Sequence, residues 1–384
     1  MSLRHTINQH LQSLEKKFQT LNRLEISRSA ILHNFDLFEQ LSPGTIIPVL
    51  KSNAYGHGLQ TIADILRDRT FPYIAVDGYF EALEIREVTN QPLLVMGYIL
   101  PANFAQIDCS AFTFVVHDLP TLEALGTTKH PVKIHLELET GMNRMGVKSA
   151  DLAHFLEELR SYPTITLEGV MTHLADADNP DPAFTTQQTQ VFDAGVDTVL
   201  AAGFQPTLFH IAQSAGSTKV TSRHANALRV GISLYGVSPL THDDPEETKL
   251  ADLQPALTAI STITKVQNLA PGEHISYGLT HTASRPMRIG IIPFGYYEGL
   301  PRALSNKGCA LHNGEVLPIV GRICMNHTLV DLTESQADWG DEVTVISANP
   351  KDQNSIARIC EDFELFNYGL LVGLNQTVRR IIVE

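Results

Sequence analysis

The chain has 384 residues, 43% of them hydrophobic, and a formal net charge of −14 at neutral pH. This length and composition favour two domains with large cores, and the negative charge argues against a nucleic-acid partner and for a soluble protein. The four cysteines have neither metal-ligand nor disulfide-framework spacing, which favours reduced thiols and the cytoplasm. Without the apolar core of a signal peptide or a run of about 18 apolar residues, neither secretion nor a membrane span is expected.

The N-terminal part of the chain combines an extension with alternating strands and helices. Residues 1–20 place apolar residues at spacings of three and four, which predicts an amphipathic helix within an extension of residues 1–23. Residues 24–245 alternate β-rich and helical segments. The expected strands are 46–50, 73–76, 93–97, 112–116, 132–138, 167–172, 208–211 and 228–232. This order predicts a (β/α)8 barrel of the TIM type. A doubly wound sheet is the alternative, although the chain has no GxGxxG loop to support it.

The pattern changes after the acidic, turn-prone residues 241–247, and the domain boundary is expected near residue 245. Residues 246–384 read as a mostly β domain, because strand-like runs follow one another with Gly and Pro between them. These runs are 256–266, 287–292, 317–323, 342–346 and a terminal strand at 378–383, with one helix at 355–362.

Lys51 stands at the end of the first expected barrel strand, before a turn of small and aromatic residues. Residues 48–58 read PVLKSNAYGHG. Parallel α/β folds place reacting groups at the carboxyl ends of strands, where partial desolvation favours the neutral, nucleophilic amine that forms a Schiff base. From the strand alone, a solvated surface lysine is the better interpretation.

Residues 49–58, VLKSNAYGHG, resemble the pyridoxal-phosphate attachment segment of the alanine racemase family. The resemblance continues in order from about residue 24 to the C-terminus. It implies that Lys51 carries pyridoxal phosphate and that Tyr55 contacts the phosphate of this cofactor. It also implies a homodimer with shared active sites, which interconverts L-alanine and D-alanine by a two-base mechanism and supplies D-alanine for peptidoglycan.

Residues 132–139, VKIHLELE, alternate apolar with polar residues, so one face of this strand meets water or a polar interior. An exposed edge strand and a polar barrel mouth both remain possible. The following TGMNRMG resembles the family segment whose arginine, here Arg144, contacts the cofactor's phenolic oxygen and the substrate carboxylate. Where the family often has a carbamylated lysine that steers this arginine, the chain has Glu137. We hypothesise that Glu137 supplies that negative charge directly.

Two later strands close with histidine and small residues, in MTHLADAD (171–178) and FHIAQSAG (209–216). A lone histidine at such a place is usually a hydrogen-bonded structural residue. By resemblance, His173 helps to orient the catalytic tyrosine, His210 supports the arginine under the cofactor ring, and Ser214 binds phosphate.

The segment LRVGISLYG, residues 228–236, resembles the family's cofactor-ring and phosphate segment. The match places Arg229 against the pyridine nitrogen, and the backbone amides of Gly231 and Ile232 on the phosphate. A surface ion pair is the plainer interpretation of Arg229. Arginine cannot accept a proton, so the pyridine nitrogen is expected to stay unprotonated and the ring to be a weaker electron sink. This favours reprotonation over transamination.

Racemisation requires two acid/base groups, one on each face of the reacting carbon. Lys51 can serve one face only. The segment HISYGLT, residues 274–280, resembles the family segment that holds the second base, here Tyr277, which acts across the dimer. From the residue alone Tyr277 would be an ordinary tyrosine of a β domain.

Three further segments resemble the family's substrate corridor: GYYEGLPR (295–302), GRICMN (321–326) and NYG (367–369). The residues carried over are Tyr296, Arg302, Arg322, Met325 and Tyr368. Glu298 and Asn326 stand where the family more often has Asp, and Gly369 where it has Glu, which bears on substrate preference. Cys324 reads as a packed thiol, and no metal site is expected.

Three rivals to an alanine racemase remain. The first is the same chemistry on serine or on a broader set of amino acids. The second is a non-catalytic barrel that carries pyridoxal phosphate, against which the second domain with Tyr277 and Met325 argues. The third is a decarboxylase, which would use an acidic residue rather than Arg229 at the ring nitrogen.

Overall fold

The computed structural model describes residues 19–42, 44–128 and 130–384. The helix predicted for residues 1–20 falls, over residues 1–18, outside the described part. The chain divides into two compact units. Unit 1 comprises the described residues up to Glu25, with Leu257–Phe366 and Gly373–Ile381, and unit 2 comprises Ile26–Ala256, Asn367–Val372 and Ile382–Glu384.

Unit 2 is built on eight parallel strands. They are β2 (Thr45–Pro48), β3 (Ile74–Val76), β4 (Leu93–Val95), β5 (Thr113–Val116), β6 (Val132–Glu139), β8 (Ile165–Met171), β9 (Leu208–His210) and β10 (Ala227–Val230). β3 to β9 form one sheet, in which the short β7 (Val147–Lys148) pairs with β6, and β10 pairs with β2. The bridge Val49–Ala75 joins β2 to β3, and a 3.0 Å bond from Asn226 N to Phe209 O joins β10 to β9. The strands therefore close a ring, which confirms the predicted barrel.

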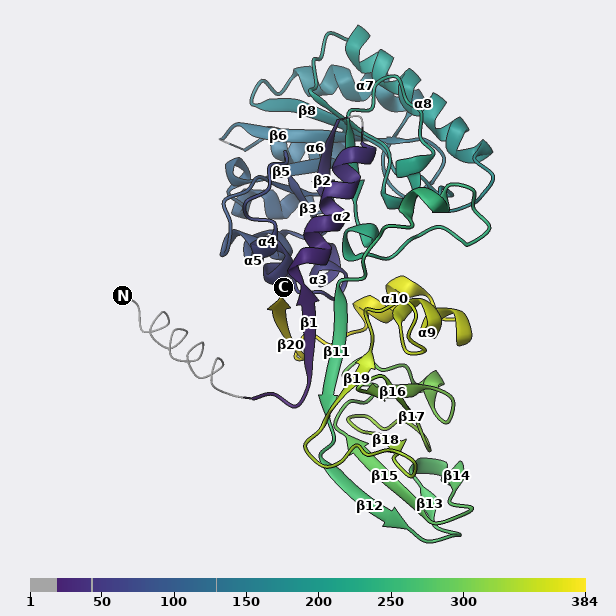
Figure 1. Cartoon of the computed structure of the whole chain (residues 1–384). Helices are drawn as coiled ribbons and strands as arrows, with labels where there is room; N and C mark the ends of the chain where they lie inside the picture. The colour runs from purple at the N-terminus through teal and green to yellow at the C-terminus, as the bar shows by residue number, and fades with distance from the viewer. Residues whose placement is uncertain (1–18, 43, 129) are drawn as a thin grey trace, which may run out of the picture. The chain divides into compact units, whose positions relative to one another are not determined.

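Helices follow the strands of this barrel, as its alternating pattern predicts. The α-helices of unit 2 are α2 (Arg28–Leu41), α3 (Lys51–Tyr55), α4 (Leu59–Ile65), α5 (Tyr79–Arg86), α6 (Leu119–Gly126), α7 (Ser149–Arg160), α8 (Ala183–Ala201) and α10 (Asn367–Val372). The 3-10 helices are η1 (Pro101–Gln106), η2 (Cys109–Ala111), η3 (Ser214–Thr218), η4 (Ile232–Tyr235) and η5 (Glu247–Leu250). In Figure 1, α7 and α8 pack side by side next to the teal strand β8.

Burial along the strands follows from their position inside the ring of helices. β3, β4 and β5 are buried at every residue, as expected of strands covered on both faces. β6 alternates apolar and polar residues, yet it pairs with β5 on one side and β8 on the other, so the edge-strand interpretation is wrong. His135 and Glu137 of β6 are buried, which makes the barrel interior polar at these two positions.

Unit 1 is mostly β. Its six-stranded sheet has the order β17-β16-β19-β11-β1-β20, beside a three-stranded sheet β12-β15-β18 and the pair β13-β14. The bounds are β1 (Arg23–Ser27), β11 (Leu257–Thr262), β12 (Lys265–Leu269), β13 (His274–Ile275), β14 (His281–Thr282), β15 (Met287–Ile292), β16 (Cys309–His312), β17 (Glu315–Pro318), β18 (Thr328–Asp331), β19 (Glu342–Ile346) and β20 (Arg379–Val383). Its helices are α9 (Ile356–Asp362) and the 3-10 turns η6 (Tyr277–Leu279) and η7 (Arg302–Leu304).

The run 256–266, predicted as one strand, is two strands in different sheets. At the break, Ile263 N donates to Asp341 O at 2.9 Å, and Thr264 N donates to Ile291 O at 2.9 Å. Asp341 precedes β19 and Ile291 lies in β15, so consecutive amides bond to different sheets. Apolar periodicity records that both halves are buried strands but not that the chain changes sheet between them.

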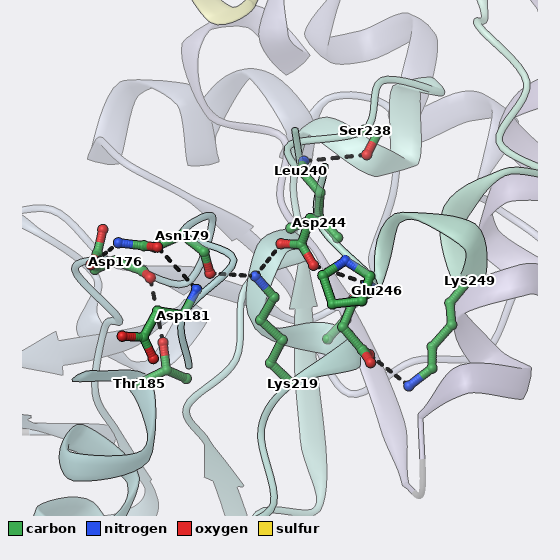
Figure 2. A network of polar contacts seen from close by, with 12 residues as sticks. Asp176, Asn179, Asp181, Thr185, Lys219, Ser238, Leu240, Asp244, Glu246 and Lys249 are labelled. Carbon is green, nitrogen blue, oxygen red and sulfur yellow. Dashed lines mark hydrogen bonds and ion pairs between the residues drawn. The ribbon is translucent and has the colours of Figure 1, made fainter. Parts of the chain in front are cut away.

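The acidic stretch 241–247 is held by a buried ion pair within unit 2 (Figure 2). Lys219, after η3, pairs with Asp244 and donates at 2.7 Å to the carbonyl of Asn179. The other oxygen of Asp244 accepts from Glu246 N at 2.9 Å. Unit 2 runs on through this stretch to Ala256. The domain boundary expected near residue 245 stays a prediction.

Candidate active site

A cavity of about 630 Å³ lies where the strands of unit 2 end. Parallel barrels gather reactive side chains at this end because every strand points there. Of the residues singled out in the sequence, those lining the cavity are Lys51, Tyr55, Glu137, Arg144, His173, Ser214, Arg229, Gly231, Ile232 and Tyr368. His210 is fully buried and contacts Arg229, while Tyr277, Tyr296 and Met325 belong to unit 1.

Lys51 starts a turn with left-handed backbone angles. Ser52 to Tyr55 have φ between 51° and 56°, values that are uncommon outside glycine and that persist where surrounding contacts hold them. The Glu81 carboxylate accepts from Ser52 N at 2.6 Å, and the Asn53 side chain accepts from Leu59 N at 2.9 Å. Gly56 closes the turn at φ 84°. This turn places both Lys51 and Tyr55 on the cavity.

Backbone approach between Gly56 and α10 explains why the turn must end in glycine. A Cβ at residue 56 would lie 2.0 Å from the carbonyl oxygen of Leu371, so no other residue fits without moving backbone. The same approach brings Tyr368 of α10 beside the turn, with ring centroids of Tyr55 and Tyr368 6.0 Å apart.

Hydroxyl and amide donors converge on one side of the cavity. Ser214 Oγ accepts from Gly231 N at 3.0 Å and from Ser233 N at 3.4 Å, and a Cβ on Gly231 would lie 2.6 Å from the hydroxyl of Tyr55. Burial raises the pKa of Tyr368 to about 12 and also raises that of Tyr55, so both phenols stay protonated donors. Clustered N–H and O–H donors suit a phosphate group.

The side chain of Arg229 is 2% exposed, and four of its five hydrogens donate to buried acceptors. Nη1 donates to His210 Nδ1 and to His210 O, both at 2.7 Å. Nη2 donates to Thr172 O at 2.7 Å and Ile211 O at 3.1 Å. Burial lowers the pKa of Arg229 to about 10, against the opposing charge of Glu137, so it stays protonated at neutral pH.

The hydrogen on Nε is the one donor that Arg229 can offer to a bound group. Within the described part of the chain no acceptor takes it up, and Arg229 lines the cavity. His173 is a neighbour of this guanidinium, with its Nδ1 3.4 Å from Nη2 of Arg229. Burial, and then the charges of Arg229, Arg144 and Lys51, lower the pKa of His173 to about 3, so this imidazole is neutral. A single uncommitted N–H of a residue that lines the cavity suits an aromatic ring nitrogen that accepts a hydrogen bond.

Glu137 faces a residue that the sequence did not single out. His117 follows β5, and its Nδ1 lies 2.6 Å from Glu137 Oε2, while its Nε2 lies 3.1 Å from the carbonyl of Met96. The contact with Glu137 is short but lies outside hydrogen-bond geometry, so within the described residues only Nε2 of this ring is hydrogen-bonded. Both side chains are buried in the cavity wall. A histidine directly after a barrel strand was the available signal, and only the pairing of β5 with β6 shows its partner.

Hydrogen bonds in unit 1 connect the segments that carry its predicted site residues. The hydroxyl of Ser276, before Tyr277, donates to Arg322 O at 2.5 Å, and Tyr296 N donates to Cys324 O at 3.1 Å. Three of these side chains are exposed: Tyr277 by 68%, Met325 by 55% and Tyr296 by 44%. Unit 1 therefore presents large side chains to solvent rather than using them in its own core.

Two of the three predicted departures from the family, Glu298 and Asn326, contact each other. Asn326 Nδ2 donates to Glu298 Oε1 at 2.8 Å, and the other oxygen of Glu298 accepts from Gly295 N at 2.8 Å. The amide of Asn326 and the carboxylate of Glu298 thus form a hydrogen-bonded pair in this chain. Arg302, in η7, is exposed. Among the described residues, no group of three or more His, Cys, Asp or Glu could hold a metal ion, and no helix is long and apolar enough to cross a membrane.

Comparison with known proteins identifies two matching family models. The model "Alanine racemase, N-terminal domain" matches residues 26–239, and "Alanine racemase, C-terminal domain" matches residues 256–382. "Alanine racemase 2" of Caldanaerobacter subterraneus is 32% identical over 94% of both chains, and the alanine racemase of Syntrophobacter fumaroxidans is 35% identical over 88% of this chain and 92% of its own.

Solved structures give the same result. Alanine racemase from Bacillus anthracis with bound L-Ala-P matches with a TM-score of 0.88 and 27% identity, covering 96% of each chain. Alanine racemase from Clostridium difficile 630 matches with a TM-score of 0.87 and 28% identity, covering 95% of this chain and 96% of its own. A Bartonella henselae structure described as having covalently bound pyridoxal phosphate matches at 24% identity with a TM-score of 0.80, which shows a shared fold.

Proposed function

The chain belongs to the alanine racemase family, and we propose that it is a pyridoxal-phosphate-dependent alanine racemase, which interconverts L-alanine and D-alanine. The observation that carries this proposal is one cavity holding Lys51, a cluster of phosphate-type donors and an arginine with a single spare hydrogen. These are the three attachments that pyridoxal phosphate needs at its aldehyde, its phosphate and its ring nitrogen.

The residues of unit 2 divide the work of holding the cofactor. Lys51 would bond to it covalently. Tyr55, Ser214, Tyr368 and the amides of Gly231 and Ile232 would hold its phosphate. The Nε hydrogen of Arg229 would donate to the ring nitrogen, which would stay unprotonated because arginine keeps its proton. His210 and His173 keep Arg229 in place through their ring nitrogens. When bound, the cofactor makes the Cα hydrogen of an amino acid acidic enough to be removed.

Proton transfer requires one base on each face of Cα, and we assign these to Lys51 and to Tyr277 of a second copy of the chain. Nζ of Lys51 removes or returns the proton on one face, and the phenolic oxygen of Tyr277 does so on the other. The 68% exposure of Tyr277 supports this, since an exposed tyrosine is available to another subunit. A homodimer with shared active sites follows from the assignment.

We assign the orientation of the substrate to one charged side chain and one backbone amide. Arg144 and the Met325 amide hold the substrate carboxylate, since a guanidinium can donate two parallel hydrogen bonds to it, and Tyr296 lines the approach. We propose that Glu137 supplies the negative charge that steers Arg144. Its place in the same cavity wall as Arg144 supports this role.

We place the activity in the cytoplasm, where it supplies D-alanine for peptidoglycan. Unpaired thiols support a reducing compartment: Cys109, Cys309 and Cys360 are buried, Cys324 is half-buried, and none forms a disulfide. Burial raises the pKa of Cys109 to about 11, so this thiol is unreactive at neutral pH.

The test is loss of optical rotation from L-alanine, L-serine and L-lysine with the wild type, Lys51→Ala and Tyr277→Phe. We expect the wild type to act fastest on L-alanine, Lys51→Ala to lose visible cofactor absorbance and activity, and Tyr277→Phe to lose activity while retaining the absorbance. Faster racemisation of L-serine or L-lysine would select the broader racemase instead. Unchanged racemisation by Tyr277→Phe in both directions would reject the two-base assignment.

A further inference from the structure

Four polar side chains run in a line through the interior of the barrel of unit 2. Arg229 Nη1 lies 2.7 Å from His210 Nδ1, and His210 Nε2 lies 2.7 Å from His135 Nδ1. His135 Nε2 then lies 3.8 Å from Glu168 Oε2, a distance that carries electrostatic attraction rather than a direct hydrogen bond. Both histidines are 0% exposed. The function proposed above uses the first two residues and leaves His135 and Glu168 without a role.

Hydrogen-bond counting fixes the tautomer of each histidine in this line. Arginine only donates, so Nδ1 of His210 must be a bare acceptor, and the proton of this ring sits on Nε2. That proton points at Nδ1 of His135, which must in turn accept, so His135 also carries its proton on Nε2. Burial lowers the pKa of both imidazoles, to about 3 for His135, so each ring keeps only this one proton.

Glu168 anchors the far end of the line. Its carboxylate accepts a hydrogen bond from the Tyr73 hydroxyl and pairs with Lys133 Nζ at 2.7 Å. Tyr73 also packs edge-on against His135, with ring centroids 5.3 Å apart. At 3.8 Å from His135 Nε2 the carboxylate makes no direct hydrogen bond, but its negative charge favours the tautomer that carries the proton on Nε2. Gly169 leaves the space that this ring occupies, because a Cβ at that position would lie 2.6 Å from His135 Nδ1.

We propose that His135 and Glu168 are positioning residues for Arg229. Glu168 sets the tautomer of His135, and His135 sets the tautomer of His210, so that a bare Nδ1 holds Nη1 of Arg229. Arg229 then keeps its Nε hydrogen directed at the cavity. The role of that hydrogen at the cofactor ring rests on the proposed function, whereas the order of tautomers does not.

Without His135, the buried Nε2 hydrogen of His210 loses its acceptor. A buried donor without a partner is unfavourable, so His210 would move its proton to Nδ1 or turn. Nδ1–H would then oppose an N–H of Arg229, and the guanidinium would shift. Leucine at position 135 produces this state, whereas glutamine offers both an acceptor oxygen and a donor and should preserve much of the line.

The first measurement uses the apoprotein with 15N-labelled histidine. Imidazole 15N shifts at neutral pH should show His210 and His135 as neutral rings protonated on Nε2, and His135→Leu should change the shifts of His210. His135→Gln should leave them near those of the wild type. Ile134→Val is the matched control, since it removes a buried methyl group from the same strand without touching the line. A folded His135→Leu protein whose His210 keeps a wild-type spectrum would overturn the proposal.

The second measurement uses the holoenzyme with cofactor labelled with 15N at the ring nitrogen. His135→Leu should move the ring-nitrogen shift and lower kcat for racemisation about 10- to 100-fold, the usual effect of removing an outer partner that orients a functional group. KM should change less than kcat, because substrate contacts remain. Glu168→Gln should change both readouts in the same direction but less. A wild type that binds no cofactor would reject the proposed function and leave the tautomer result standing, so the two failures are distinguishable.

Discussion

Gly231→Ala tests whether the donors around Ser214 and Tyr55 form a phosphate cradle. The new Cβ would lie 2.6 Å from the Tyr55 hydroxyl and 3.2 Å from Cζ of that ring. Ordinary carbon–oxygen contacts begin at roughly 3.3 Å, so the phenol must withdraw from the cradle. Overpacking of this kind costs about 1–3 kcal/mol. Since about 1.4 kcal/mol is a factor of ten, the dissociation constant of pyridoxal phosphate should rise about 5- to 150-fold.

The assay is titration of apoprotein with pyridoxal phosphate, followed by the absorbance of the bound cofactor. Gly78→Ala is the matched control, because nothing lies within 4 Å of a Cβ at that position. The same substitution is also made in a Tyr55→Phe protein, which lacks the clashing oxygen. In that protein Gly231→Ala should weaken pyridoxal phosphate binding less than it does in the wild type, and the difference measures the coupling between residues 55 and 231. An equal loss in both backgrounds, or a loss no greater than that of Gly78→Ala, would refute the cradle.

Three further outcomes are expected. Lys219→Met leaves the buried carboxylate of Asp244 unpaired and should lower the free energy of unfolding by about 3–5 kcal/mol in denaturant titrations, whereas Lys249→Met, in an exposed pair, should cost under about 1 kcal/mol. Glu137→Gln should raise KM for alanine more than it lowers kcat, and an unchanged KM in steady-state assays would contradict the steering role. In the folded protein the pKa of His173 is about 3, whereas in the unfolded chain it is about 6.5. The contribution of the neutral ring to the free energy of unfolding is therefore complete above about pH 6.5 and is lost as the pH falls below that value. Between pH 7 and 5 the wild type should therefore lose about 2 kcal/mol more stability than His173→Gln.

Resemblance and pattern together found most of the cavity residues in advance. Lys51, Arg144 and Arg229 each follow or end a barrel strand, and parallel strands deliver their ends to one place, so sequence order was enough to group them. His117 was not found, because its importance depends on which strand lies beside β5. His135 was read only as part of an alternating strand, since nothing local indicates a second histidine from β9 at 2.7 Å.

Unit 1, the mostly β unit, shows the opposite balance. Strand periodicity predicted a mostly β domain, but the division of residues 256–266 between two sheets and the entry of β1 into the six-stranded sheet depend on pairing across long sequence separations. Propensity describes how a segment fits a pleated surface and carries no information about its neighbour. The pairing of Glu298 with Asn326 is hidden in sequence for the same reason.

The sequence by itself determined the class of fold and the reactive side chains, because alternation of strands and helices and the chemistry of lysine, arginine and tyrosine are local properties. The tertiary structure decided what each group can donate or accept. Arg229 has five hydrogens in any context, and only closure of the barrel commits four of them to buried acceptors and leaves the Nε hydrogen uncommitted in a residue that lines the cavity. Lys51 likewise lines that cavity at the start of a left-handed turn that hydrogen bonds of Ser52 with Glu81 and of Asn53 with Leu59 hold in place.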